Sequence, residues 1–288
     1  MDYFIHIAII VSIYVILGLS LNLIVGYTGL LSMTQAAFYG IGAYATAILM
    51  TDKGMNFFAS LVFGALITGV ASLLIGIILS RFRDDYYALG SFGFNVIVWS
   101  VFLNWQELTR GPLGIPGIKR PELFGFWFDD NFSFLVLSML FALVAYLICE
   151  FIAASSFGRV LKAIREDEEA IRVFGYKTHL YKLAIFVIGA VMAGVAGALF
   201  ASYITFIDPS TFSLNESIFI LAIIIMGGLA SNKGAVLGAV FLILLPEVLR
   251  FVGFPSDIAA QMRQVTYGLI LILLMLYRPQ GMLGKYKL

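Results

Sequence analysis

The chain has 288 residues, of which 61% are hydrophobic and 12% are charged, and its formal net charge is +1. The mean hydropathy of +0.99 is far from that of a soluble domain and indicates a membrane protein that crosses the bilayer several times. This charge does not favour nucleic-acid binding. The single cysteine, Cys149, lies in an apolar run and excludes a disulfide or a cysteine-based metal framework within the chain.

Apolar runs near the length that a bilayer requires predict an all-α polytopic helix bundle, in one domain over residues 1–288. The first run lacks the basic flank of a secretory signal and should be retained. The predicted spans are residues 5–25, 29–50, 57–79, 86–106, 132–153, 181–206, 214–229, 235–252 and 263–277. The run at 214–229 is short, and the break at 26–29 could be an unwound segment, so we expect about eight to ten crossings.

Polar residues inside the predicted spans are candidates for a transport pathway. They are Asn22, Gln35, Asn95 and Glu216. Because a polar group in lipid is costly, each should face the bundle interior, where it either lines a path or joins helices by hydrogen bonds. For each residue taken singly, the second role is favoured.

A faint internal repeat relates two of these residues. Ser32–Phe38 matches Ser213–Phe219 in residue character, and the predicted topology runs the two copies in opposite directions. Inverted repeats often surround a translocation path, although seven loosely similar positions could also be coincidence. If the repeat is real, Gln35 and Glu216 occupy related depths.

Small residues recur every four positions in three spans. The stripes are Gly64, Thr68, Ser72 and Gly76; Gly189, Ala193, Gly197 and Ala201; and Gly234 with Gly238. Such stripes let helix backbones approach closely in lipid, where van der Waals packing replaces the hydrophobic effect. We expect this packing within the chain more than with a neighbouring subunit.

Two long loops separate the spans. Twelve of the 18 Lys and Arg residues fall on the side that carries residues 155–180 and the C-terminus, so this side is predicted to be cytoplasmic. The loop at 107–131 then faces outward. Residues 155–180 predict an amphipathic helix between Gly158 and Gly175, which could lie among lipid headgroups or dock into a groove of a partner protein.

Familiar catalytic and cofactor signatures are absent from the sequence. The glycines at 40–42 lie inside a span without a preceding strand, and residues 228–234 lack the Gly-Lys-Ser/Thr ending of a phosphate loop. The two histidines cannot form a metal cluster, and no Ser-His-Asp set is apparent. We therefore expect a transport subunit without a metal or nucleotide site, and not an enzyme.

Five blocks of the sequence, in this order along the chain, resemble the motifs of a known protein family. They are Asn22–Ser32 with Ala37–Tyr44; Asn104–Trp105 with Thr109–Ile115; Gly158–Arg159 with Ala163–Glu168 and Gly175; Gly227–Ser231 with Gly234; and Leu245–Glu247 with Arg278–Gly281. Along nearly its whole length the chain resembles the permeases of bacterial high-affinity branched-chain amino-acid ABC importers, of the M-type rather than the H-type. Some relatives have an additional first span.

This resemblance implies partners and a location. Two ATP-binding-cassette ATPase subunits, a second permease of the H-type and a periplasmic or lipid-anchored substrate-binding protein would complete the importer in the bacterial inner membrane. ATP would be bound by the ATPase subunits, so this chain is expected to bind no cofactor. The solute would be a small amino acid.

The resemblance also implies which residues meet those partners. The helix between Gly158 and Gly175 would be the coupling helix, and its docking residues would be Arg159, Leu161, Ile164, Arg165, Glu166, Asp167, Glu168 and Ile171. Ile164 and Ile171 would be its apolar anchors. The loop facing the binding protein would use Thr109, Gly111, Pro112, Gly114 and Ile115.

Two alternatives remain open from the sequence. Related permeases of the same superfamily carry urea, short amides or other small polar solutes. An ATP-independent secondary transporter is possible as well, but it needs a cage of ligands at the membrane midplane that the sequence does not show.

Overall fold

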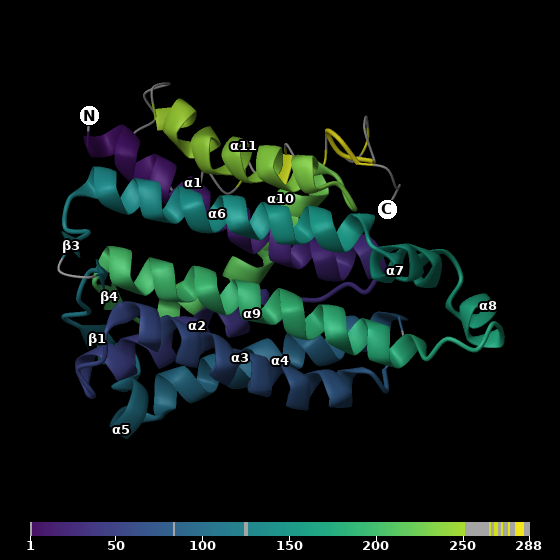
Figure 1. Ribbon diagram of the computed structural model, residues 1–288, viewed down its shortest axis with the longest axis horizontal. Coiled ribbons are helices and arrows are strands. Elements are labelled where there is room, and N and C mark those ends of the chain that lie inside the picture. The colour runs from purple at the N-terminus through teal and green to yellow at the C-terminus, as the bar shows by residue number, and fades with distance from the viewer. Residues whose placement is uncertain are drawn as a thin grey trace.

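The computed structural model describes residues 2–82, 84–123, 126–250, 265, 268, 269, 272, 276 and 280–284. Within these residues the chain is a bundle of long helices, roughly aligned with the long axis of the molecule, and its strands are only two residues long (Figure 1). The prediction of an all-α bundle is confirmed.

The long helices follow the apolar runs. They are α1 (Asp2–Leu21), α2 (Gln35–Thr51), α3 (Phe57–Leu79), α4 (Asp84–Asn104), α6 (Asn131–Ala154), α9 (Thr178–Ile204), α10 (Leu214–Gly227) and α11 (Asn232–Arg250). Within the described residues, five helical stretches are long and apolar enough to cross a bilayer: Asp2–Gly26, Phe57–Leu79, Asp85–Asn104, Asn131–Ala154 and Thr178–Ile204. The predicted span at 263–277 lies almost wholly outside the described residues.

The shorter elements gather at the two ends of the bundle (Figure 1). One end, here called the strand end, holds α5 (Gln106–Thr109), η2 (Gly111–Leu113), β1 (Ile115–Pro116), β2 (Glu122–Leu123), β3 (Phe126–Trp127) and β4 (Phe206–Ile207). There, β1 pairs with β4 and β2 with β3, both antiparallel. From β4 the chain turns inward through η3 (Pro209–Phe212), where Phe212 is fully buried and the Pro209 carbonyl accepts from Trp99 of α4 at 3.0 Å. The other end, the α8 end, holds α7 (Ser156–Glu166) and α8 (Glu168–Val173).

The chain leaves α1 through a π-helix, η1 (Asn22–Gly26), and residues 29–34 are not helical. The predicted span at 29–50 is therefore wrong at its start, since α2 begins only at Gln35. Hydrogen bonds from side chains explain the break: the Leu30 N–H donates to Thr28 Oγ1 at 3.3 Å, and the Met33 N–H donates to Ser91 Oγ of α4 at 3.0 Å. Side chains thus satisfy backbone groups that a helix would otherwise pair.

The small-residue stripes bring α2, α3 and α9 into close contact. A Cβ on Gly197 of the α9 stripe would lie 2.0 Å from the Tyr39 carbonyl oxygen of α2, and one on Gly64 of the α3 stripe would lie 2.7 Å from Thr46 Oγ1 of α2. The stripe of α11 behaves likewise, because a Cβ on Gly238 would lie 2.2 Å from the Ile223 carbonyl oxygen of α10. Close packing within the chain, as predicted, is confirmed.

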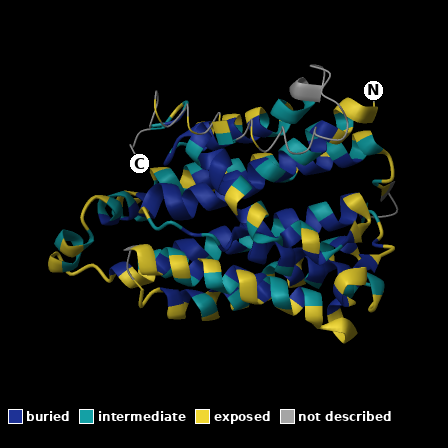
Figure 2. Cartoon of the chain, turned by 180° about the vertical axis from the view of Figure 1, so that it is seen from behind, coloured by how far each residue is buried: buried dark blue, intermediate teal, exposed yellow. Residues whose placement is uncertain are grey.

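The outward faces of the bundle are apolar. Large hydrophobic side chains are exposed along α3, α4 and α6, including Leu66, Val70, Ile97, Leu140 and Leu147. Exposed residues line these outer surfaces while the interior is buried (Figure 2). A continuous apolar exterior of this kind fits contact with lipid, so the protein is a multi-pass integral membrane protein.

The contact between α2 and α9 predicts a sharp steric effect. A Cβ on Gly197 would lie 2.0 Å from the Tyr39 carbonyl oxygen, so Gly197→Ala should destabilise the fold by about 3 kcal/mol. The matched control is Gly93→Ala, because a Cβ there meets no other atom within 4 Å. Thermal unfolding of the detergent-solubilised protein should show a lower Tm for the first variant only. Equal Tm values would mean that the two helices do not touch at Gly197.

Candidate functional site

The amphipathic helix α7 is fastened to its own bundle. Ser155 caps it by accepting a hydrogen bond from the Gly158 N–H at 3.2 Å. Its apolar side chains turn inward, so that Leu161 is 0% exposed and Ile164 is 3% exposed. Ile164 was expected to anchor a partner protein, but it is buried against this chain and offers no surface for docking.

Basic residues of α7 bind the carbonyl ends of neighbouring helices. Arg159 donates to the Ala154 carbonyl at 3.3 Å, and Lys162 donates to the Ala153 carbonyl at 3.2 Å. Arg165 donates to the carbonyl oxygen of Gly26, where η1 ends. Positive charge at a helix C-terminus is stabilising. Arg159 and Arg165, expected to dock to a partner, therefore hold the loop onto the bundle.

The predicted single helix between Gly158 and Gly175 is in fact two helices. Asp167 is extended (φ −156°) and caps α8, since its Oδ1 accepts from the Ala170 N–H at 2.9 Å. A short acidic side chain binds backbone N–H groups more readily than it continues a helix, which explains the break. Gly158 lies inside the first turn of α7, whereas Gly175 (φ +87°) follows α8 as its stop.

Glu168 ties α8 to the start of α9. Its carboxylate accepts from Arg172 at 2.7 Å, from Thr178 Oγ1 at 2.8 Å and from Lys182. Burial disfavours its ionised form, but the hydrogen bonds from Lys182 and Thr178 and the neighbouring positive charges outweigh this and lower the pKa of Glu168. This predicted docking residue therefore shapes the loop.

The exposed apolar part of the loop is its tip, which we define as Val173, Phe174 and Tyr176. Val173 is 88% exposed and Phe174 is 77% exposed, and α8 projects beyond the helices of the bundle (Figure 1). Of the predicted docking residues, Arg159, Glu166 and Asp167 are exposed and Ile171 is half-buried. The sequence analysis did not identify the tip as a docking surface, because helical periodicity favoured Ile164. Val173 and Phe174, an apolar pair directly before Gly175 in a charged segment, were the signal that could have identified it.

At the strand end, most of the predicted contact residues shape the loop from inside. Thr109 is buried and its hydroxyl is 2.7 Å from the Phe102 carbonyl, and Gly111 has φ +55°. Gly114 has φ +67°, and a Cβ there would lie 2.2 Å from the Ile207 carbonyl oxygen. Glycine is required at such a position.

Of the five predicted contact residues at this end, only Pro112 is exposed. Ile115 pairs with Ile207 across the two strands and is 1% exposed, whereas Pro112 is exposed. The neighbouring Leu113 is 83% exposed and was not predicted. Pro112 and Leu113 thus form the outward surface of a defined turn.

Asn22, a predicted pathway residue, joins segments of the chain. Its Oδ1 accepts from the Ala230 N–H at 3.0 Å, and its Nδ2 donates to Asn232 Oδ1 at 3.2 Å. The Tyr27 hydroxyl donates to the same Asn232 Oδ1 atom at 3.3 Å. Asn22 therefore has the helix-joining role that was favoured for it.

Gln35 and Asn95 are both fully buried in the interior. The Asn95 Nδ2 donates to Ser217 Oγ at 3.2 Å, and the same oxygen accepts from the Ala36 N–H at 2.9 Å. Gln35, which adjoins Ala36, donates to Ser20 Oγ of α1. Glu216, beside Ser217, is partly buried and accepts from Tyr14 at 2.6 Å.

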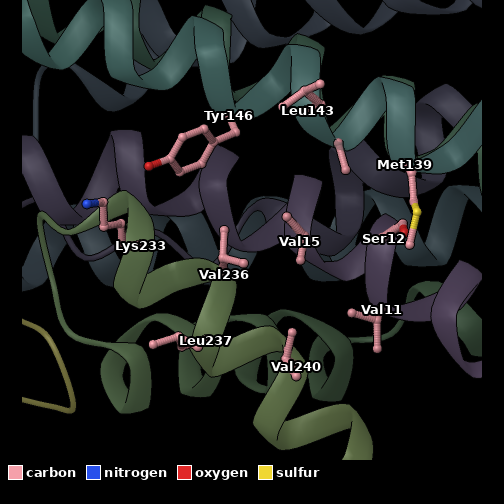
Figure 3. Close-up of a pocket in the computed structure, with 11 residues that line it drawn as sticks. Val11, Ser12, Val15, Met139, Leu143, Tyr146, Lys233, Val236, Leu237 and Val240 are labelled. Carbon is pink, nitrogen blue, oxygen red and sulfur yellow. The ribbon is translucent and has the colours of Figure 1, made fainter.

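Two pockets flank the described bundle. A polar pocket of about 620 Å³ at the α8 end is lined by residues 28–31, by Asp85, Asp167 and Glu169, and by Arg165 and Lys182 among others. A second, of about 490 Å³, lies between α1, α6 and α11, and its walls are mainly apolar, with Lys233 and Tyr146 at one end (Figure 3). Because the first pocket has both acidic and basic side chains, it suits a solute that carries both charges. The second pocket is mainly apolar and suits a hydrocarbon chain.

Metal ligands do not cluster in the part of the chain that the structure describes, where no group of three or more His, Cys, Asp and Glu residues could hold an ion. The two functional features are therefore the exposed loops at either end and the polar interior between α2, α4 and α10.

Comparison with known proteins identifies the family. Residues 3–276 match the family described as branched-chain amino acid transport system, permease component. The chain is 36% identical to the high-affinity branched-chain amino acid transport system permease protein LivM of Salmonella typhimurium, over 97% of this chain and 69% of that protein. It is 27% identical to the corresponding protein LivH of Escherichia coli K12, over 95% and 92%. No solved structure matches.

The M-type resemblance predicted from the motifs is confirmed by these identities. The matched region includes both loops and the polar interior described above. Since the family match covers most of the chain, this protein belongs to the permease components of the branched-chain amino acid transport systems.

Proposed function

We propose that this chain is a transmembrane permease subunit of an ABC importer for branched-chain amino acids, energised by separate ATPase subunits. The observation that carries the proposal is the family match together with a rigid, protruding apolar tip at one end of the bundle. LivM and LivH are both permease proteins of high-affinity branched-chain amino acid transport systems, which supports a second permease subunit beside this one. The solute alternatives and the secondary transporter are not favoured.

The orientation of the proposal follows from charge. Basic residues are concentrated at the α8 end, so this end would face the cytoplasm of a bacterial inner membrane, together with the C-terminus. The strand end would face outward, toward a periplasmic or lipid-anchored substrate-binding protein. ATP would be bound by the ATPase subunits rather than by this chain.

The tip is the proposed contact with an ATPase subunit. Exposed apolar side chains in water mark an interaction surface, and Phe174 is of the aromatic type that carries much of the energy of an interface. Glu166 and Asp167 would form its polar rim. Because α7 is fixed to α6 and η1 through Arg159, Lys162 and Arg165, a displacement of the tip would be passed to the helices.

A pair of variants at opposite ends tests both docking surfaces. Phe174→Asp should weaken co-purification of the ATPase subunits roughly 30-fold, because a charge replaces a buried aromatic anchor of the interface. Leu113→Asp, equally exposed at the strand end, should leave ATPase binding intact and should weaken the association of the binding protein. Unchanged ATPase binding by Phe174→Asp would refute the docking role of the tip.

The Glu168 interactions predict a pH-dependent stability. Since its pKa is lowered in the folded protein, the carboxylate stabilises the fold fully above the unfolded value of about 4.3, and this contribution is lost as pH falls through the lowered value. The Tm difference between the native protein and Glu168→Gln should thus be constant above pH about 5 and should narrow below it. Glu166→Gln is the control; this side chain is exposed, so its Tm should follow the native curve at every pH.

A further inference from the structure

The apolar pocket between α1, α6 and α11 is a groove on the outside of the bundle. Both α6 and α11 pack along α1 but scarcely touch each other, so α1 forms the floor between them. Ser12 and Val15 of this floor are buried, whereas Leu143 of α6 is 55% exposed and Leu237 of α11 is 46% exposed. The groove therefore has a closed floor, two raised rims and an open outer side, with a volume of about 490 Å³.

Along its length the groove is apolar. The hydroxyl of its floor, Ser12 Oγ, donates to the Ala8 carbonyl at 2.9 Å and is thereby paired within α1. The other side chains between the two ends include Val11, Val15, Met139, Ala142, Val236 and Val240. From Lys233 to Val240 the groove follows α11 for roughly two helical turns, or about 10 Å. A polar solute would gain no hydrogen bond along this length, whereas a hydrocarbon chain would lose none.

Polar side chains of the groove lie at one end. The Lys233 nitrogen and the Tyr146 hydroxyl turn toward this same end (Figure 3). Lys233 is exposed, and its ammonium group has no ion pair within the part of the chain that the structure describes. Glu150, one turn after Tyr146 on α6, interacts with the Tyr146 hydroxyl. An exposed cation beside an apolar groove can therefore accept an anionic group.

This end of the groove lies at the α8 end of the bundle. Asn22 of η1 donates to Asn232, the neighbour of Lys233, at 3.2 Å. Arg165 of α7 donates to the carbonyl oxygen of Gly26, where η1 ends. Lys233 thus lies where α1 and η1 end, close to the basic loop. Lysine and tyrosine are typical of the level at which hydrocarbon meets lipid headgroups, because their polar tips reach water while their stems stay in the apolar layer.

Positive charge prevails around this end. Lys162 Nζ lies 5.4 Å from the centroid of the Tyr27 ring, and the Tyr27 hydroxyl donates to Asn232. Two ammonium groups, those of Lys162 and Lys233, therefore face one carboxylate, that of Glu150. A net positive site at the headgroup level favours an anionic headgroup over a zwitterionic one.

We propose that the groove binds one anionic phospholipid. One acyl chain lies along α1 between α6 and α11, and the phosphate pairs with the Lys233 ammonium group, with Tyr146 bordering the headgroup. The polar end alone would suit any phosphate, but the apolar length requires an amphiphile. Basic side chains between membrane helices form binding sites for such headgroups. The bound chain would also join α6 to α11, which make little contact of their own.

Native mass spectrometry of the full-length protein in a mild detergent tests this site. The protein is titrated with dioleoylphosphatidylglycerol, with dioleoylphosphatidylcholine, which has the same chains and no net charge, and with glycerol 3-phosphate, which has no chains. One phosphatidylglycerol should be retained, with a Kd about fivefold or more below that of phosphatidylcholine. Glycerol 3-phosphate should not bind.

A matched pair of lysine variants tests the charge. Lys233→Gln should raise the Kd for phosphatidylglycerol about fivefold, because one lysine near an anionic lipid contributes about that factor. Lys177→Gln should leave this Kd unchanged, since Lys177 is also exposed at the α8 end but lies outside the groove.

A second pair, on α6, tests the position of the acyl chain. Ala142→Phe places a ring in the groove and should abolish retention of the phospholipid. Val136→Phe, exposed on the same helix but outside the groove, should bind with the native Kd. The Tm of each variant in lipid-free detergent should match that of the native protein, which shows that a lost lipid is not a lost fold.

Three results would overturn the inference. Equal Kd values for the two phospholipids, or an unchanged Kd in Lys233→Gln, would remove the anionic site. Native affinity in Ala142→Phe would mean that the lipid binds elsewhere. If the separated chain retains the lipid but the assembled transport complex does not, another protein segment covers the groove. None of these results bears on the proposed function, which is tested by subunit co-purification.

Discussion

The hydrogen bonding of the backbone within the membrane is the constraint on which this structure depends. Lipid offers no partner for a free N–H or carbonyl group, so non-helical backbone is tolerated only where protein surrounds it. The break before α2 meets this condition through Ser91, which accepts from the Met33 N–H, and through the contact of Ala36 with Ser217. The helices around these breaks must therefore pack closely, and Gly42, Gly194 and Gly197 allow this.

The same close packing gives the bundle the stiffness that coupling requires. A force applied at the tip reaches α6 and η1 through three basic side chains of α7, and it reaches α9 through Glu168 and Lys182. Because the backbones of α9, α2 and α3 approach closely at Gly42, Gly194 and Gly197, movement of one helix displaces its neighbours. The loop at the α8 end and the contact between α2 and α10 are thus parts of one mechanical unit.

In both loops, residues that were expected to contact a partner protein instead hold the loop in its conformation. Ile164 and Arg165 face their own bundle, and so do Thr109 and Ile115 at the other end. The exposed residues are their neighbours, Val173 and Phe174 at the α8 end, and Leu113 at the strand end. Inside the chain, buried contacts hold each loop in position so that a few side chains can project from it.

The sequence by itself determined the membrane class, the positions of most helices, the small-residue packing faces and the family. These follow from hydropathy over some twenty residues and from spacing along one helix, which are local properties. The break at Asp167 was not predicted, because the helical periodicity of the apolar residues continues through it. Its side chain could either continue the helix or cap a new one, and the sequence does not distinguish the two.

Only the tertiary structure decided which side of α7 is free and which polar residues meet. Periodicity identifies an apolar face but not its partner, so Ile164 was assigned to another protein when its own bundle covers it. Gln35, Asn95 and Ser217 are far apart in the sequence and are brought together by three helices. The depth in the membrane at which α2 and α10 begin depends on those contacts, and no pattern within either helix's own sequence predicts it.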